Sequence, residues 1–64
     1  MRRYEKTIKE DDRYILTRVR DREGFYNVWL LEKTGAIRDY SGRLESKAKA
    51  KLAEKKLIRR YFIG

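Results

Sequence analysis

The sequence contains no cysteine, no histidine and no proline among its 64 residues. The absence of cysteine and histidine excludes disulfides, structural zinc of the usual kind, thiol nucleophiles and imidazole general bases. We therefore expect a protein that is not an enzyme and that holds no cofactor and no metal. The absence of cysteine also agrees with a reducing compartment.

Long hydrophobic runs are missing as well. Met1-Arg2-Arg3 is followed by no apolar stretch of signal-peptide length, and no segment approaches the roughly 20 apolar residues of a membrane span. We expect a protein without a membrane partner, in the cytoplasm or on the nucleoid.

Acidic residues become scarce toward the C-terminus. The chain has 18 Lys and Arg against 10 Asp and Glu, a net charge of +8. Residues 41–64 hold eight of the basic and two of the acidic side chains, so this segment alone carries net +6. A positive field confined to one side of a molecule attracts polyanions through counterion release and steering. The expected partner is therefore nucleic acid.

Short segments rich in aromatic and branched side chains, with alternating polarity, predict β-strands. Asp21-Arg22-Glu23-Gly24 and Thr34-Gly35 predict tight turns between them, with Gly24 free to take a positive φ. Residues 3–8 form either an additional N-terminal strand or a frayed tail, and we expect the strand. The predicted strands are residues 13–20, 25–33 and 36–40, with 3–8 as the additional one.

Residues 43–61 predict one α-helix, because they lack Gly and Pro and consist largely of strong helix formers. Ser41-Gly42 is expected to end the last strand and to start the helix. The whole chain, residues 1–64, is predicted to form one α+β domain, a three- or four-stranded antiparallel β-meander with the C-terminal helix packed on one sheet face. The apolar surface of the helix is divided between two arcs, of which the second holds Leu44, Ala48 and Leu52, and we expect the first arc to face the core. The residues of the first arc are Ala50, Ala53, Leu57 and Tyr61.

A row of basic residues follows the predicted helix at intervals of four. Like charges at this spacing repel, and a polyanion, or solvent and salt, compensates them. A solvated helix face with cations near its C-terminus is the alternative explanation. The shortage of acids in this segment favours phosphate contacts. The row is Lys47, Lys51, Lys55 and Arg59, joined by Lys56 and Arg60.

The sheet is a second candidate surface. We expect the helix to cover the face made of Ile15, Val19, Val28 and Leu30. The other face then gathers Leu16, Trp29 and several arginines, where Arg and Asn can bond to base edges. For Trp29 we expect a place in the core instead, because a domain of this size needs the burial of its only tryptophan for stability. The candidate contact residues on the strands are Arg18, Arg20, Asn27 and Arg38.

Glu10-Asp11-Asp12, with Asp21 and Glu23, forms an acidic group in the sequence. Its spacing matches no cation-binding loop, and hairpin turns commonly hold Asp and Glu. We interpret these residues as turn residues.

The order of strand, turn, strand, tight turn, strand and helix resembles the small DNA-binding domain of phage and transposon tyrosine recombinases, and that of plant ethylene-responsive factors. The likeness rests on Tyr26-Asn27-Val28-Trp29-Leu30, the Lys33-Thr34-Gly35 turn, the strand ending at Tyr40 and the helix rich in Ala, Lys and Glu. The family uses its sheet to enter the major groove, with the helix as support. The resemblance therefore implies base contacts by Arg18, Arg20, Asn27 and Arg38.

Two functions follow from these patterns. The first is a small basic accessory or regulatory protein that binds nucleic acid, with duplex DNA favoured over RNA. Abundant Lys, Arg and Glu without Cys or Pro indicate a phage, mobile-element or thermophile origin. The alternative is a phage-type inhibitor that binds a host protein, such as a nuclease, through its aromatic and basic sheet face. Homodimerisation through the edge strand stays open.

Overall fold

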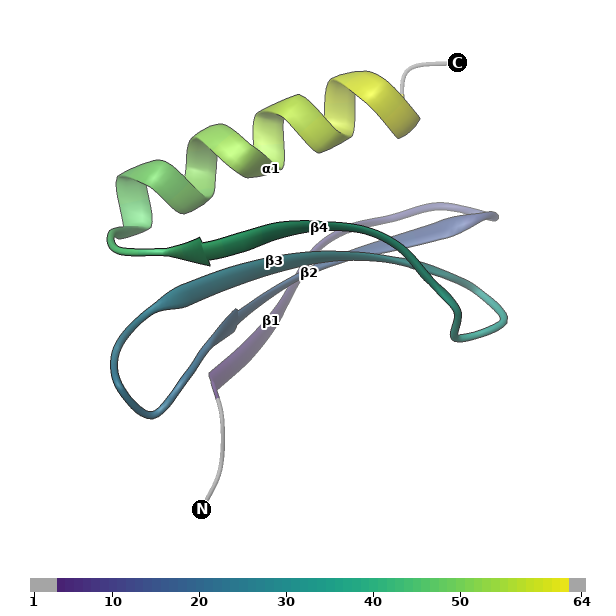
Figure 1. The fold of residues 1–64 in the computed structure, drawn as a ribbon. Coiled ribbons are helices and arrows are strands. Elements are labelled where there is room, and N and C mark those ends of the chain that lie inside the picture. Colours follow the sequence, from purple (N-terminus) through teal and green to yellow (C-terminus); the bar gives the residue numbers. More distant parts are fainter. Residues whose placement is uncertain (1–3, 63–64) are drawn as a thin grey trace.

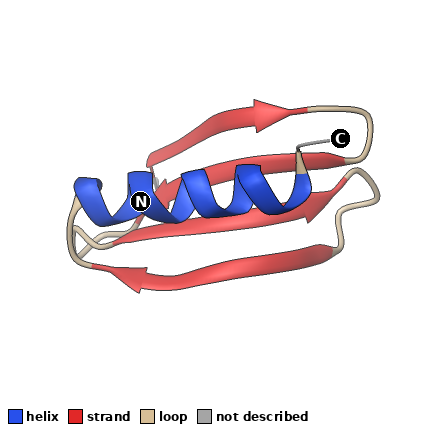
Figure 2. Cartoon of the chain, turned by 90° about the horizontal axis from the view of Figure 1, so that it is seen from above, coloured by secondary structure: helices blue, strands red, loops and turns tan. Residues whose placement is uncertain are grey.

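A computed structural model describes residues 4–62 as a four-stranded sheet followed by one helix (Figure 1). The elements are β1 (Tyr4–Glu10), β2 (Tyr14–Arg20), β3 (Tyr26–Glu32), β4 (Ile37–Leu44) and α1 (Lys47–Tyr61). All neighbouring strands are antiparallel and follow chain order, which confirms the predicted α+β meander with a fourth strand. Figure 2 shows α1 above the middle of the sheet, with an outer strand beyond it on either side. Within residues 4–62, no helix is long and apolar enough to cross a membrane.

The β2–β3 hairpin closes with a three-residue loop. The Asp21 N–H donates to the Phe25 carbonyl at 2.9 Å, and Gly24 has φ +92°. Because L side chains rarely adopt this φ, a glycine at the last loop position is the expected solution for a three-residue hairpin. The Asp21 carboxylate also accepts the N–H groups of Glu23 and Phe25. The loop therefore sets one register for the two central strands.

This register contradicts the predicted orientation of β2. Leu16 lies opposite Leu30, which packs under α1, and Arg18 points to the same side. Ile15 and Val19, which we expected under the helix, lie on the open face, by which we mean the sheet face away from α1. Both sides of β2 carry bulky apolar side chains, so alternation did not reveal which side faces the helix. The length of the hairpin loop decides it.

The last strand is longer than predicted, and the helix begins later. β4 continues through Ser41 to Leu44, and the Ser41 hydroxyl accepts the Val28 N–H at 3.0 Å. This serine supports strand pairing and does not cap the helix. Ser46 is the N-cap, and its hydroxyl accepts the Lys49 N–H at 3.2 Å. Both serines have the cap chemistry, and the contact with β3 keeps the first one in the sheet.

Both edge strands contain bulges. The pairing of β1 with β2 shifts between Thr7 and Lys9, and the pairing of β4 with β3 shifts at two places. Gly42, with φ +87°, lies in the irregular part of β4. Bulges of this kind twist an edge and oppose its pairing with the edge of another chain.

The core lies between α1 and the two central strands. Leu16, Val28 and Leu30 are fully buried, and each such side chain contributes about 1.5–3 kcal/mol relative to exposure. The helix closes this cluster with the arc predicted from the sequence, whose members are all buried or half-buried. They are Ala50, Ala53, Leu57 and Tyr61.

A buried ion pair joins the helix to the sheet beside this core. The Arg18 guanidinium donates to the Glu54 carboxylate at 2.9 Å, and the two side chains are 11% and 8% exposed. Glu54 lies on the same side of α1 as the buried Ala50 and Leu57. An acidic residue on an apolar stripe needs a cation on the facing element, and the structure shows that this cation is Arg18.

Candidate nucleic-acid interface

The exposed surface of α1, from one flank of the helix to the other, carries five basic side chains, which we call the basic ridge: Lys47, Lys51, Lys55, Lys56 and Arg59. All five are exposed, and none has an ion-pair partner within residues 4–62. At about 1.5 Å per residue the ridge is about 18 Å long, roughly five base-pair steps of duplex DNA. The acidic residue of α1, Glu54, is buried against the sheet and paired there. The charge of the ridge is therefore presented to solvent.

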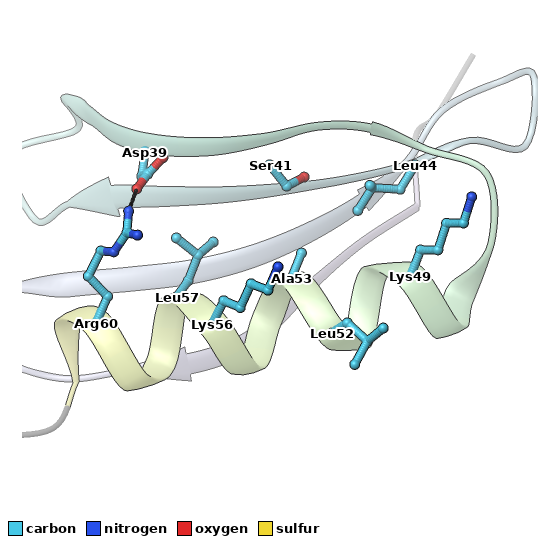
Figure 3. A pocket seen from close by; sticks show the side chains of 9 residues that line it. All are labelled: Asp39, Ser41, Leu44, Lys49, Leu52, Ala53, Lys56, Leu57 and Arg60. Carbon is cyan, nitrogen blue, oxygen red and sulfur yellow. Dashed lines mark ion pairs between the residues drawn. The ribbon is translucent and has the colours of Figure 1, made fainter.

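Two further basic residues of the helix are paired at its side. Arg60 lies 3.7 Å from the Asp39 carboxylate (Figure 3), and Lys49 lies 3.1 Å from that of Glu45. Both cations are largely exposed, and exposed pairs of this kind contribute only about 0–1 kcal/mol. They can exchange these partners for a stronger anion.

The predicted arginines of the strands do not form one surface. Arg18 is half-buried and is held in the ion pair described above, so base contacts by this residue would require that pair to break. Arg20 is exposed on the helix side, with its guanidinium 5.7 Å from the Tyr26 ring centre. Arg38 reaches toward the end of α1, 5.9 Å from the Tyr61 ring centre. The arrangement that the resemblance implied, with these side chains together on the open face, is not observed.

The open face holds an aromatic stack. The rings of Trp29 and Tyr40 lie 3.8 Å apart at 14°, and the Tyr40 hydroxyl donates to the Asn27 amide oxygen at 2.5 Å. Trp29 is half-buried here, and its predicted place in the core is wrong, because the register sets it opposite Thr17 and away from α1. Ile37 on the same face is 62% exposed. This face is aromatic and apolar, and Asn27 is the predicted contact residue that it retains.

The open face has little free positive charge. Among the described strand residues of this face, Arg43 is the one cation, and it pairs with Asp21 at 3.3 Å and with Glu23. Its guanidinium also lies 4.2 Å from the Phe25 ring centre. Partial desolvation raises the pKa of Asp21, but the backbone N–H groups that it accepts, and Arg43 beside it, outweigh this and lower the pKa below its usual value.

Of the acidic residues interpreted as turn residues, Glu10 ends β1 instead, and Asp11, Asp12, Asp21 and Glu23 lie in the turns as predicted. The Asp11 carboxylate accepts the N–H groups of Tyr14 and Arg13, both at 2.8 Å, and these bonds lower its pKa. Asp21 does the same in the second hairpin. Within residues 4–62, no three potential ligand side chains cluster so that they could hold a metal ion.

Two grooves flank the helix. The larger, of about 380 Å³, separates α1 from β4, and Figure 3 shows side chains of the two elements facing each other across it. Its floor is apolar and its rim is basic, with Lys49, Lys56 and Arg60 at the rim and Leu44, Ala53 and Leu57 below.

The smaller groove, of about 240 Å³, lies at the other side of α1, where the helix begins. It brings Lys6 of β1 to the basic ridge, a residue that sequence reasoning missed because the orientation of β1 was not predicted. The lining residues are Glu5, Lys6, Arg18, Arg20, Tyr26 and Lys47.

No protein-family model matches the chain, and no curated protein or solved structure matches it. The resemblance to the recombinase DNA-binding domain stays a prediction. The function must therefore be inferred from the charges and the geometry of the side chains.

Proposed function

We propose that the protein is a non-enzymatic nucleic-acid-binding protein that contacts the backbone of duplex DNA through the basic ridge. The observation that carries this proposal is the set of five exposed cations on one helix, none of them paired within residues 4–62. Long flexible side chains with unit charge suit phosphate contacts, which need charge more than fixed geometry.

The energetics of the helix support the same conclusion. Lys47, Lys51, Lys55 and Arg59 repeat at intervals of four, and like charges at this spacing destabilise a helix by a few tenths of a kcal/mol per pair. A surface selected for solubility alone usually mixes both signs of charge. A polyanion along the ridge would relieve the repulsion and release its own counterions.

The proposal predicts a steep salt dependence. If all five ridge residues contact phosphates of duplex DNA, the slope of log K against log salt is about −4.5, at about −0.9 per contact. Fluorescence anisotropy with a labelled duplex between about 50 and 200 mM salt measures this slope. A wild-type protein that shows no salt-sensitive binding at low micromolar concentration would contradict the proposal.

Charge reversal within the ridge tests the site. Lys51→Glu combined with Lys55→Glu should abolish most of the affinity for duplex DNA and leave the fold intact, since both side chains are exposed. Arg13→Glu combined with Arg22→Glu is the matched control, because it changes the net charge equally at exposed residues outside the ridge. Equal losses in the two variants would show that only net charge matters. Parallel titrations with single-stranded DNA and RNA separate the nucleic-acid classes.

A second candidate function, binding of a protein partner, is favoured by the open face. Tyr40 and Ile37 are exposed there beside Trp29, and interface hot spots favour Trp and Tyr. Pull-down after nuclease treatment, with wild type and with Ile37→Asp, tests it. A partner that survives nuclease and is lost in the variant would support protein binding.

A further inference from the structure

The smaller groove collects positive charge from three separate elements. Lys6 comes from β1, Arg20 from β2 and Lys47 from α1. Lys6 lies opposite Arg18 in the sheet, so it shares the helix-facing side with the arginines of β2. The three cations are thus brought together by tertiary structure, and they are far apart in the sequence.

The cations of this groove are not neutralised by the fold. The charge of Arg18 is balanced by Glu54, but Lys6, Arg20 and Lys47 have no ion pair within residues 4–62. Glu5 is the acidic residue of the lining, opposed by three unpaired cations. Converging like charges repel, and their placement has no evident benefit for folding.

The groove also offers a defined surface for an anion. The guanidinium of Arg20 lies against the Tyr26 ring, which limits its freedom before any ligand binds. The helix begins at Lys47 with no acidic residue in its first turn, and the positive end of its dipole adds to the field. A volume of about 240 Å³ is ample for a phosphate group.

We propose that this groove binds a phosphate group and fixes one end of the nucleic acid on the basic ridge. Lys47 belongs to both the groove and the ridge, so a backbone that follows the ridge reaches the groove without a break. The inference in this form rests on the proposed function. The same chemistry also accepts a free phosphate or a terminal monoester, and the experiment distinguishes these sources.

The test uses a groove variant that carries both Lys6→Gln and Arg20→Gln. Its matched control carries both Lys9→Gln and Arg13→Gln, which removes the same number of charges at exposed sites outside the groove. Anisotropy with a duplex should show about tenfold weaker binding for the groove variant and a salt slope whose magnitude falls by about 0.9, the share of one phosphate contact. The control should keep the wild-type slope. Arg20→Gln alone, with Arg13→Gln as its control, serves as a second variant if the double variant is poorly folded.

A phosphate titration provides the independent readout. Inorganic phosphate added to the wild-type protein should shift the amide NMR signals of Tyr26 and Lys47, two lining residues that the groove variant keeps, and these signals should not shift in that variant. The groove would be assigned to a free or terminal phosphate if these shifts occur while the groove variant keeps the wild-type salt slope of duplex DNA binding. Tighter binding of a 5′-phosphorylated oligonucleotide would then indicate the terminal phosphate.

The inference is overturned if the groove variant matches wild type both in its salt-dependent DNA binding and in its phosphate-induced NMR shifts. If Lys51→Glu with Lys55→Glu abolishes DNA binding in that case, the proposed function stands without the phosphate groove. Phosphate shifts in a wild-type protein that binds no DNA would instead support the groove as a phosphate site and contradict the proposed function.

Discussion

The two faces of the sheet are made from the same strands and yet differ in chemistry. The face toward α1 combines the apolar core with cations at both flanks of the helix. The open face has an aromatic stack and, among its described strand residues, one cation, Arg43, which is paired with turn acids. Side chains alternate between faces, so one register separates an electropositive side from an aromatic one. Charge-driven binding and apolar binding thus belong to opposite sides of this molecule.

The largest expected effect concerns the ion pair under the helix. Glu54→Ala leaves Arg18 buried without a partner and should cost about 3–5 kcal/mol. A 64-residue domain has roughly 3–10 kcal/mol of stability in total, so this variant should lose a large part or all of its stability. Replacing both residues, with Arg18→Met and Glu54→Leu, should restore stability to near or above that of wild type. Urea denaturation followed by circular dichroism measures all three proteins, and a stable Glu54→Ala protein would contradict the burial of the pair.

The difference in burial between the faces predicts unequal costs of truncation. Leu30→Ala on the helix side should destabilise by about 2–5 kcal/mol, because it leaves a cavity in the core. Ile37→Ala on the open face should change stability by no more than about 0.5 kcal/mol in the isolated protein. Thermal unfolding of the two variants checks this. A comparable loss for Ile37→Ala would indicate that another molecule covers the open face in solution.

A smaller effect is expected from the aromatic stack. Tyr40→Ala removes the partner of Trp29 and should cost about 0.5–1.5 kcal/mol, with a red shift of tryptophan emission as the ring meets water. Tyr40→Phe is the matched control, because it keeps the stacked ring and loses only the hydrogen bond to Asn27. Identical emission from wild type and Tyr40→Ala would argue against the stack. Neither change should affect DNA binding, since both lie away from the basic ridge.

The smallest effect concerns acid sensitivity of the turns. The folded-state pKa of Asp21 lies below its ordinary value of 3.8, so its ionised form stabilises the fold above that pH. The stabilisation is lost as pH falls through the folded-state pKa. Asp21→Asn keeps the side-chain acceptor and removes the charge, so the stability gap to wild type should shrink from about pH 5 to about pH 2. Asp12→Asn, in the exposed part of the other acidic turn, serves as control. A gap independent of pH would show that the charge of Asp21 contributes nothing.

Local chemistry predicted most of the elements. Gly24 at the end of the β2–β3 loop and the turn at Thr34-Gly35 lie where they were predicted, and the Ala-rich and Lys-rich helix ends as predicted but begins four residues later, at Lys47. The exposure of the basic ridge was also predictable, because Lys and Arg at helical spacing opposite an apolar arc must point outward. The boundary between β4 and α1 was not predictable from the sequence, because Ser41 and Ser46 are equally suited to cap a helix.

By itself, the sequence determined the strand and helix types, the turns and the excess positive charge near the C-terminus. Only the tertiary structure decided which face of β2 meets the helix, and with it the pairing of Arg18 with Glu54, the place of Trp29 on the open face and the meeting of Lys6, Arg20 and Lys47. The physical reason is that both faces of β2 carry bulky side chains, so hydrophobic alternation has two solutions of similar merit. The hairpin register selects the arrangement in which Leu16 faces the helix. In this arrangement Arg18 also lies where it can pair with the buried Glu54 carboxylate.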